Sequence, residues 1–234
     1  MMAMPFRILF EKTGKPISQE SIKKELSAFS KSYDRVVKTI IDNSANLRRD
    51  IFNFNVATLM PTFGMTRTTK SVFYGMRIEK DVPVDSIYHV LDVCWEKFGD
   101  ALEDLKKHIN RNISNRNRAI LELPEETKNF VVSMASELFD KLEWTTVSDI
   151  YIGRVGASKI LFAIYPELAL PVDNTEWDYV FRTHNYGKVL STMIDEIKEW
   201  SKIKRVNLET LSEYSQATLP SVYNVMAMAA RPKR

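Results

Sequence analysis

The sequence predicts a mainly α-helical protein, a multi-helix bundle that contains a helix–hairpin–helix-like element and allows a short β-hairpin near the N-terminus. Only seven of the 234 residues are glycine, which disfavours a sheet-rich protein with many tight turns. Apolar residues recur every three or four positions over most of the chain, which is the period of one helix face. Hydrophobic residues at 44% and charged residues at 27% are typical of a soluble globular protein.

The first half of the chain contains one short strand pattern and two long helical patterns. Residues 6–10 form the strand pattern. Apolar spacing then predicts helix over residues 18–54, with a break near Asn43. Pro83 starts the next helix, since proline is tolerated in a first turn. The apolar pattern of that helix ends at the polar, turn-rich residues 110–118, which we interpret as a loop.

The second half is also helical. Pro124 opens a helix that reaches Leu142, with acidic residues at its positive end. Residues 145–152 are expected to make a short helix or turn, and residues 153–156 a turn. Further helices are predicted over residues 157–165, 173–182 and 188–200, with a last one from Pro220.

The asparagine- and arginine-rich residues 110–118 are the one plausible linker in the sequence. We therefore expect an N-terminal helical portion over residues 1–120 and a C-terminal helical portion over residues 121–234, which carries the hairpin. A single domain is the alternative, because 234 residues suit one domain of moderate size as well as two small ones.

Charge, cysteine content and hydropathy exclude several classes of protein. A net charge of +3 is too mildly basic to identify a partner. Cys94 is the single cysteine, and its apolar helical neighbours predict a reduced core residue. No apolar stretch reaches membrane-spanning length, and the N-terminus lacks the pattern of a signal peptide. We expect a cytoplasmic protein without a membrane partner.

The most informative stretch is Tyr151-Ile-Gly-Arg-Val-Gly-Ala-Ser-Lys159, which is followed by an apolar helix and then Leu170-Pro-Val-Asp173-Asn-Thr-Glu-Trp177. Paired glycines let a backbone approach a phosphate closely, and the amides of the next helix start point at it. A lysine whose pKa is lowered can attack the anomeric carbon of a sugar, and a carboxylate can stabilise the positive charge that develops there. A base must be flipped out of the DNA stack for this chemistry.

Residues 147–182 resemble the helix–hairpin–helix DNA glycosylases. The resemblance is carried by Val155-Gly-Ala-Ser-Lys159 and by Pro171-Val-Asp173. It implies that Lys159 is a Schiff-base nucleophile, that Asp173 is its carboxylate partner, and that DNA is bound through its backbone. The residues expected to contact nucleic acid in this stretch are Gly153, Arg154, Gly156 and Ser158.

The same residues also fit an ordinary structural role. Asp173 and Glu176 have the spacing of a capping box, in which the first carboxylate caps a helix and the second reaches back. Lys159 can lie exposed on a short helix, while Gly153 and Gly156 can form a helix C-cap and a turn. The sequence leaves both interpretations open.

Other residues allow two interpretations each. Arg111, Arg116 and Arg118 can contact phosphates or belong to a solvated loop. Trp177 can stack on a flipped base or pack in the core. The three histidines lie too far apart in sequence for metal-ligand spacing, so we expect neither a metal nor a cofactor.

Three functions remain. The first is a DNA-repair enzyme, a glycosylase or lyase acting on a damaged or modified base, which requires Lys159 and Asp173 to lie within a few ångströms of each other. The second is a non-enzymatic nucleic-acid-binding protein that grips the backbone through residues 153–159. The third is a helical protein-interaction module, which should expose an apolar patch.

Overall fold

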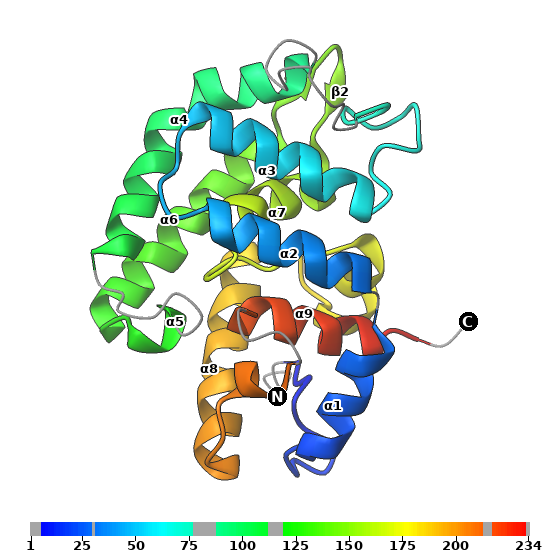
Figure 1. Cartoon of the computed structure of the whole chain (residues 1–234), viewed down its shortest axis with the longest axis vertical. Helices are drawn as coiled ribbons and strands as arrows, with labels where there is room; N and C mark the ends of the chain where they lie inside the picture. The colour runs from blue at the N-terminus through cyan, green and yellow to red at the C-terminus, as the bar shows by residue number, and fades with distance from the viewer. Residues whose placement is uncertain (1–5, 30, 77–87, 112–118, 213–216, 233–234) are drawn as a thin grey trace.

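The structure, a computed structural model, describes residues 6–29, 31–76, 88–111, 119–212 and 217–232 (Figure 1). Within these residues most of the regular structure is helical, and the sheet has two short strands. The predicted mainly α class, a multi-helix bundle with a short β-hairpin, is confirmed.

Three consecutive helices replace the predicted helical run over residues 18–54. Ser18 caps the first of them, because its hydroxyl accepts a hydrogen bond from the Ser21 amide at 3.1 Å. The chain breaks after Ala28 and again after Asn43, the second break being the predicted one. The helices are α1 (Gln19–Ala28), α2 (Lys31–Asn43) and α3 (Arg49–Thr62).

Two long helices follow, and they pack against each other. They are α4 (His89–Asn110) and α6 (Glu125–Glu143), separated by the single turn α5 (Ala119–Glu122). Cys94 is fully buried on α4, as the apolar pattern predicts. Figure 1 shows α4 and α6 side by side along one flank of the molecule.

A β-hairpin connects α6 to the next helix. Strand β1 (Thr146–Val147) pairs antiparallel with β2 (Ile150–Tyr151). Ser148 and Asp149 form the turn with φ of 48° and 64°, values typical of a two-residue hairpin loop. The sequence predicted a helix or turn here and a strand at residues 6–10. Near the N-terminus, the described residues form only an isolated bridge between Phe10 and Pro16.

Helix α7 (Gly153–Ile164) lies at the centre of the bundle and packs against α3 and α6. It begins at Gly153, so the predicted turn over residues 153–156 is wrong and Gly156 lies within the helix. Helices α6 and α7 do flank a hairpin, but the two β-strands form it rather than the two glycines.

The C-terminal part packs beside the loop that follows α7. A π-helix, η3 (Glu176–Phe181), precedes α8 (Tyr186–Lys204), the 3-10 turn η4 (Leu208–Leu211) and α9 (Leu219–Ala229). Thr218 and Ser221 form a reciprocal capping box at the start of α9. Helix α9 contacts α1, α8 and η3, which brings the C-terminal tail next to the residues that follow α7.

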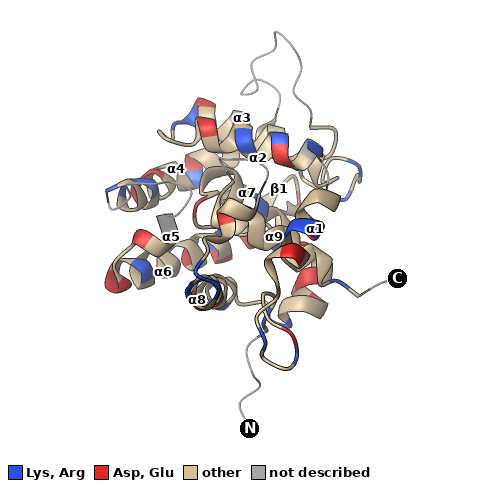
Figure 2. Cartoon of the chain, turned by 60° about the horizontal axis from the view of Figure 1, so that its bottom comes forward, with Lys and Arg blue, Asp and Glu red and all other residues tan. Residues whose placement is uncertain are grey.

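The hydrophobic core includes buried residues from both sides of residue 120, while the division of the chain near that residue stays a prediction. Acidic and basic residues are interspersed along the outer helices (Figure 2). Among the described residues, no helix is both long enough and apolar enough to cross a membrane.

Candidate functional site

Lys159 is buried in the middle of α7. Only 1% of its side chain is exposed, and its ammonium group lies 4.4 Å from the centre of the Phe63 ring at the end of α3. Burial lowers the pKa of Lys159 because it penalises the charged form, while Asp173 opposes that shift. The position combines a desolvated amine with an aromatic face, an arrangement that favours a cation–π contact.

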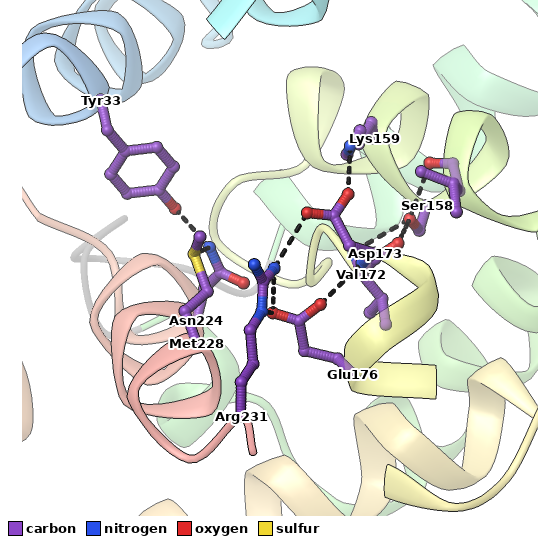
Figure 3. Close-up of polar contacts among 10 residues, drawn as sticks. Tyr33, Ser158, Lys159, Val172, Asp173, Glu176, Asn224, Met228 and Arg231 are labelled. Carbon is purple, nitrogen blue, oxygen red and sulfur yellow. Dashed lines mark hydrogen bonds and ion pairs between the residues drawn. The ribbon is translucent and has the colours of Figure 1, made fainter. Parts of the chain in front are cut away.

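Asp173 contacts Lys159 directly, although 14 residues separate the two in sequence (Figure 3). The loop between them is fixed to α7 by Ser158, whose hydroxyl accepts a hydrogen bond from the Val172 amide at 3.0 Å. Tyr186 holds the same loop from α8, since its hydroxyl accepts from the Leu170 amide at 3.0 Å and donates to the Leu170 carbonyl at 3.0 Å. The proximity of amine and acid required by the enzyme hypothesis is therefore present.

Arg231 joins the pair from the C-terminal tail. Its Nη2 lies 2.9 Å from Asp173 Oδ2, and its Nε donates to Glu176 Oε1 at 2.6 Å. Glu176 Oε2 in turn accepts a hydrogen bond from the Asp173 amide at 3.1 Å. Two cations and two carboxylates thus form one network at the junction of α7, η3 and α9 (Figure 3).

The expected capping box is formed only in part. Glu176 does reach back to the Asp173 amide, as the spacing predicts. The Asp173 carboxylate instead contacts Lys159 and Arg231, so helix capping does not explain this acid. Desolvation raises the pKa of Glu176, and Arg231 counteracts that shift.

Exposure differs sharply within the network. The Asp173 side chain is 29% exposed, whereas those of Lys159 and Glu176 are each 1% exposed. The Asp173 side chain is therefore partly accessible to solvent, whereas the Lys159 amine is covered. In chemical terms, the arrangement presents a carboxylate whose two oxygens are each held by a cation.

The four residues expected to contact nucleic acid near α7 divide into two groups. Gly153 has φ of +69° and open space where a Cβ would lie, and the Arg154 side chain is 34% exposed with Glu143 3.7 Å away. Gly156 and Ser158 are buried. A Cβ on Gly156 would lie 3.0 Å from the Phe73 ring, so this glycine allows close packing rather than phosphate approach.

The other expected contacts are not gathered at this site. Arg111 is exposed at the C-terminal end of α4, whereas the β-hairpin lies near the N-terminal end of the same helix. A helix of 22 residues is about 33 Å long at about 1.5 Å per residue, so Arg111 is remote from the N-terminal end of α7, where Gly153 and Arg154 lie. Arg116 and Arg118 lie outside the described residues.

Trp177 is fully buried against Phe139 and Tyr186, with ring centroids 5.7 and 6.2 Å away. It therefore packs in the core and presents no free face to a base. Among the residues that the structure describes, no cluster of three histidine, cysteine, aspartate or glutamate side chains could hold a metal ion.

Sequence reasoning missed Arg231 and Phe63. Arg231 is 58 residues from Asp173, and no spacing rule links a tail arginine to a particular carboxylate. Phe63 directly follows α3, and the apolar pattern there marks many residues as core without distinguishing one that faces an amine.

A family model described as Y4jQ matches residues 9–142, the part of the chain from the N-terminal bridge to the end of α6. Of the network residues, Lys159, Asp173, Glu176 and Arg231 all follow the matched part. Neither the search of curated proteins nor the search of solved structures found a match.

Proposed function

The chain belongs to the Y4jQ family, and we propose that it is a DNA-binding protein that excises a damaged or modified base by hydrolysis. The observation that carries the proposal is the Asp173 carboxylate, which is partly exposed while Lys159 and Arg231 each hold one of its oxygens. A carboxylate fixed in this way is prepared to stabilise positive charge in a transition state, because it needs no reorganisation when the charge develops.

The reaction breaks the bond between the sugar C1′ and the base nitrogen, and the electron pair leaves with the base. Asp173 faces the cationic sugar and accepts a proton from the attacking water, whose oxygen bonds to C1′. The proton that Asp173 takes is passed to the departing base, so the products are a free base and an abasic sugar. Lys159 supports Asp173 and does not itself attack, because its amine is covered.

Two features of the chain support DNA as the partner. The first turn of α7 contains no acidic residue, and its open Gly153 allows a phosphate to approach the free amides of the helix start. Arg154, in the same turn, is partly exposed and adds a positive charge. These contacts would grip the backbone without reading bases, which suits an enzyme that recognises a lesion by flipping it out.

A base-release assay tests the proposal. Duplexes that each carry one deaminated, oxidised or alkylated base are incubated with the protein, and free base is measured by mass spectrometry. Asp173→Asn should reduce the release rate by about 10²- to 10⁴-fold. Asp178→Asn is the matched control, since Asp178 is an exposed acid on η3, which follows Asp173 in the chain, and should leave release unchanged.

The outcome also separates hydrolysis from lyase chemistry. We expect no borohydride-trapped adduct on Lys159, while an adduct there would make the lysine the nucleophile and overturn the hydrolytic mechanism. Failure to release base from every lesion would reject the proposed function.

A second candidate function is partner binding, and the hairpin favours it. Trp144 and Tyr151 are 69% and 56% exposed, and their rings meet edge to face at 5.8 Å. An exposed aromatic pair of this kind is typical of an interaction surface. If this surface binds another protein, Trp144→Ala should weaken that binding and leave base release unchanged.

A further inference from the structure

We infer that Arg231 is a positioning residue of this site: it fixes the orientation of the Asp173 carboxylate from the C-terminal tail. The inference rests on the proposed function, because it concerns the group that would face the sugar. Arg231 lies outside residues 147–182, so the site extends to the tail that follows α9.

The geometry of the carboxylate carries the first step. Lys159 contacts Oδ1 of Asp173, and Arg231 Nη2 lies 2.9 Å from Oδ2. A single contact would leave the carboxylate free to rotate about its terminal torsion, since such torsions have broad energy wells. Two contacts on different oxygens, made from α7 and from the tail, fix the plane of the group (Figure 3).

Glu176 explains how a tail residue is held in place. Arg231 Nε donates to Glu176 Oε1 at 2.6 Å, and Glu176 Oε2 accepts from the Asp173 backbone amide at 3.1 Å. Asp173, Glu176 and Arg231 therefore form a closed ring of contacts. Glu176 anchors Arg231, and Arg231 orients the carboxylate of Asp173 in the same segment. Because 1% of the Glu176 side chain is exposed, this acid depends on Arg231 for a cationic partner.

The chemistry of the side chain explains why the residue is an arginine. A guanidinium group presents N–H donors in a rigid plane and can serve two carboxylates at once. Arg231 uses this capacity: Nη2 contacts both Asp173 and Glu176, and Nε donates to Glu176 as well. A lysine has one compact ammonium group and cannot reproduce both contacts in the same directions, so Arg231→Lys should restore function only in part.

The first part of the test measures base release by three variants and by the unchanged protein. Arg231→Ala should lower kcat by about 10²-fold, the cost of a misplaced reacting group, while KM stays within about twofold. Arg231→Lys should lie between Arg231→Ala and the unchanged protein. Arg48→Ala is the matched control, because Arg48 is an exposed arginine paired with Asp50 and distant from the network in sequence.

The second part is chemical rescue. Millimolar methylguanidinium should restore a measurable fraction of kcat to Arg231→Ala, because it can occupy the vacated place between Asp173 and Glu176. It should not accelerate Asp173→Asn. A residue that merely stabilises the fold would show no such rescue, and its loss would change the thermal midpoint instead.

The third readout does not need activity. Arg231 lowers the pKa of Glu176, so carbon NMR of the Glu176 carboxyl should show a higher pKa in Arg231→Ala than in the unchanged protein. An unchanged Glu176 titration would overturn the placement of Arg231. If the unchanged protein releases base, an Arg231→Ala variant with the same kcat would overturn its positioning role. Absence of release from the unchanged protein would reject the proposed function and this role with it, and the Glu176 titration would then report on the network alone.

Discussion

Among the described residues, two lysine–carboxylate pairs have a buried lysine next to an aromatic ring, and they differ in how far the acid is exposed to solvent. Lys106 on α4 contacts Glu167, and the two side chains are 3% and 1% exposed. Lys159 on α7 contacts Asp173, whose side chain is 29% exposed. Both ammonium groups lie near an aromatic ring, at 5.7 Å from Tyr165 and 4.4 Å from Phe63.

We call Lys106–Glu167 the sealed pair and Lys159–Asp173 the open pair. The sealed pair ties α4 to the end of α7, because Lys106 also donates to the Ile164 carbonyl at 3.2 Å. The open pair shares its acid with Arg231 and exposes part of it. A lysine–carboxylate pair thus joins two helices in one place, and under the proposed function it serves chemistry in the other.

The largest expected effect on stability separates the two pairs. Glu167→Ala removes the carboxylate that Lys106 contacts and leaves a buried cation, which should cost about 3–5 kcal/mol of unfolding free energy. Asp173→Ala should cost less, because Asp173 is already partly hydrated and the pKa of Lys159 is lowered, so that the amine can lose its charge more easily. Urea unfolding at neutral pH measures both. Equal losses of unfolding free energy in the two variants would show that the exposure of the acid does not affect its contribution to stability.

A second prediction concerns the glycines near the open pair. Gly156→Ala should destabilise the protein by about 1–3 kcal/mol, since the new Cβ would meet Ile152 at 2.9 Å and Phe73 at 3.0 Å. Gly153→Ala has room for its Cβ but keeps φ of +69°, so it should cost about 1 kcal/mol. Thermal unfolding of the two glycine variants measures the difference in stability. If Gly156→Ala weakened DNA binding without changing stability, this glycine would belong to the binding surface.

A third buried acid shows what burial does without a lysine partner. Glu196 accepts hydrogen bonds from the Leu9 amide at 2.5 Å and the Tyr223 hydroxyl at 2.6 Å. Burial raises the pKa of Glu196 from its ordinary value of 4.5 to about 6. Because the folded state holds this proton more tightly, the stability it contributes is full below pH 4.5 and is lost as pH rises through 6.

That loss amounts to about 2 kcal/mol, since one pKa unit is worth about 1.4 kcal/mol. Thermal midpoints should be measured between pH 4 and pH 7, at about one point per half pH unit. They should fall less steeply with rising pH in Glu196→Gln than in the unchanged protein. Parallel curves for the two proteins would assign the pH dependence to other groups.

The smallest loss of stability is expected from replacing a whole pair. Lys106→Met combined with Glu167→Leu should be close to neutral or stabilising, by up to about 4 kcal/mol, because the cost of burying both charges disappears. Lys159→Met combined with Asp173→Leu should also fold, and base release should be abolished only in this second double variant. Loss of base release in both would remove the functional distinction between the pairs.

The helices could be predicted from the sequence, and the reasons are visible in particular residues. Pro124 precedes α6 (Glu125–Glu143), and Pro220 lies in the first turn of α9. The β-hairpin could not be predicted, because Ser148 and Asp149 adopt positive φ without the asparagine–glycine signal that usually marks such a turn. Because the hairpin was not predicted, the start of α7 at Gly153 was not predicted either.

The candidate site could be predicted only in its central pair. The resemblance to the helix–hairpin–helix DNA glycosylases implied that Lys159 and Asp173 pair, and the two do meet. Their burial could not be predicted, because the amphipathic pattern of a short, apolar helix does not distinguish a lysine at its edge from one inside the bundle. The role of Arg231 depends on how the tail packs over η3, which is a long-range consequence of the fold.

The most direct test of the account compares base release by Asp173→Asn and Glu167→Gln, two amide substitutions in the open and the sealed pair, under conditions in which both variants remain folded. The account predicts that Asp173→Asn loses about 10²-fold or more of the release rate, while folded Glu167→Gln keeps the rate of the unchanged protein. Equal rates for the two folded variants would contradict it.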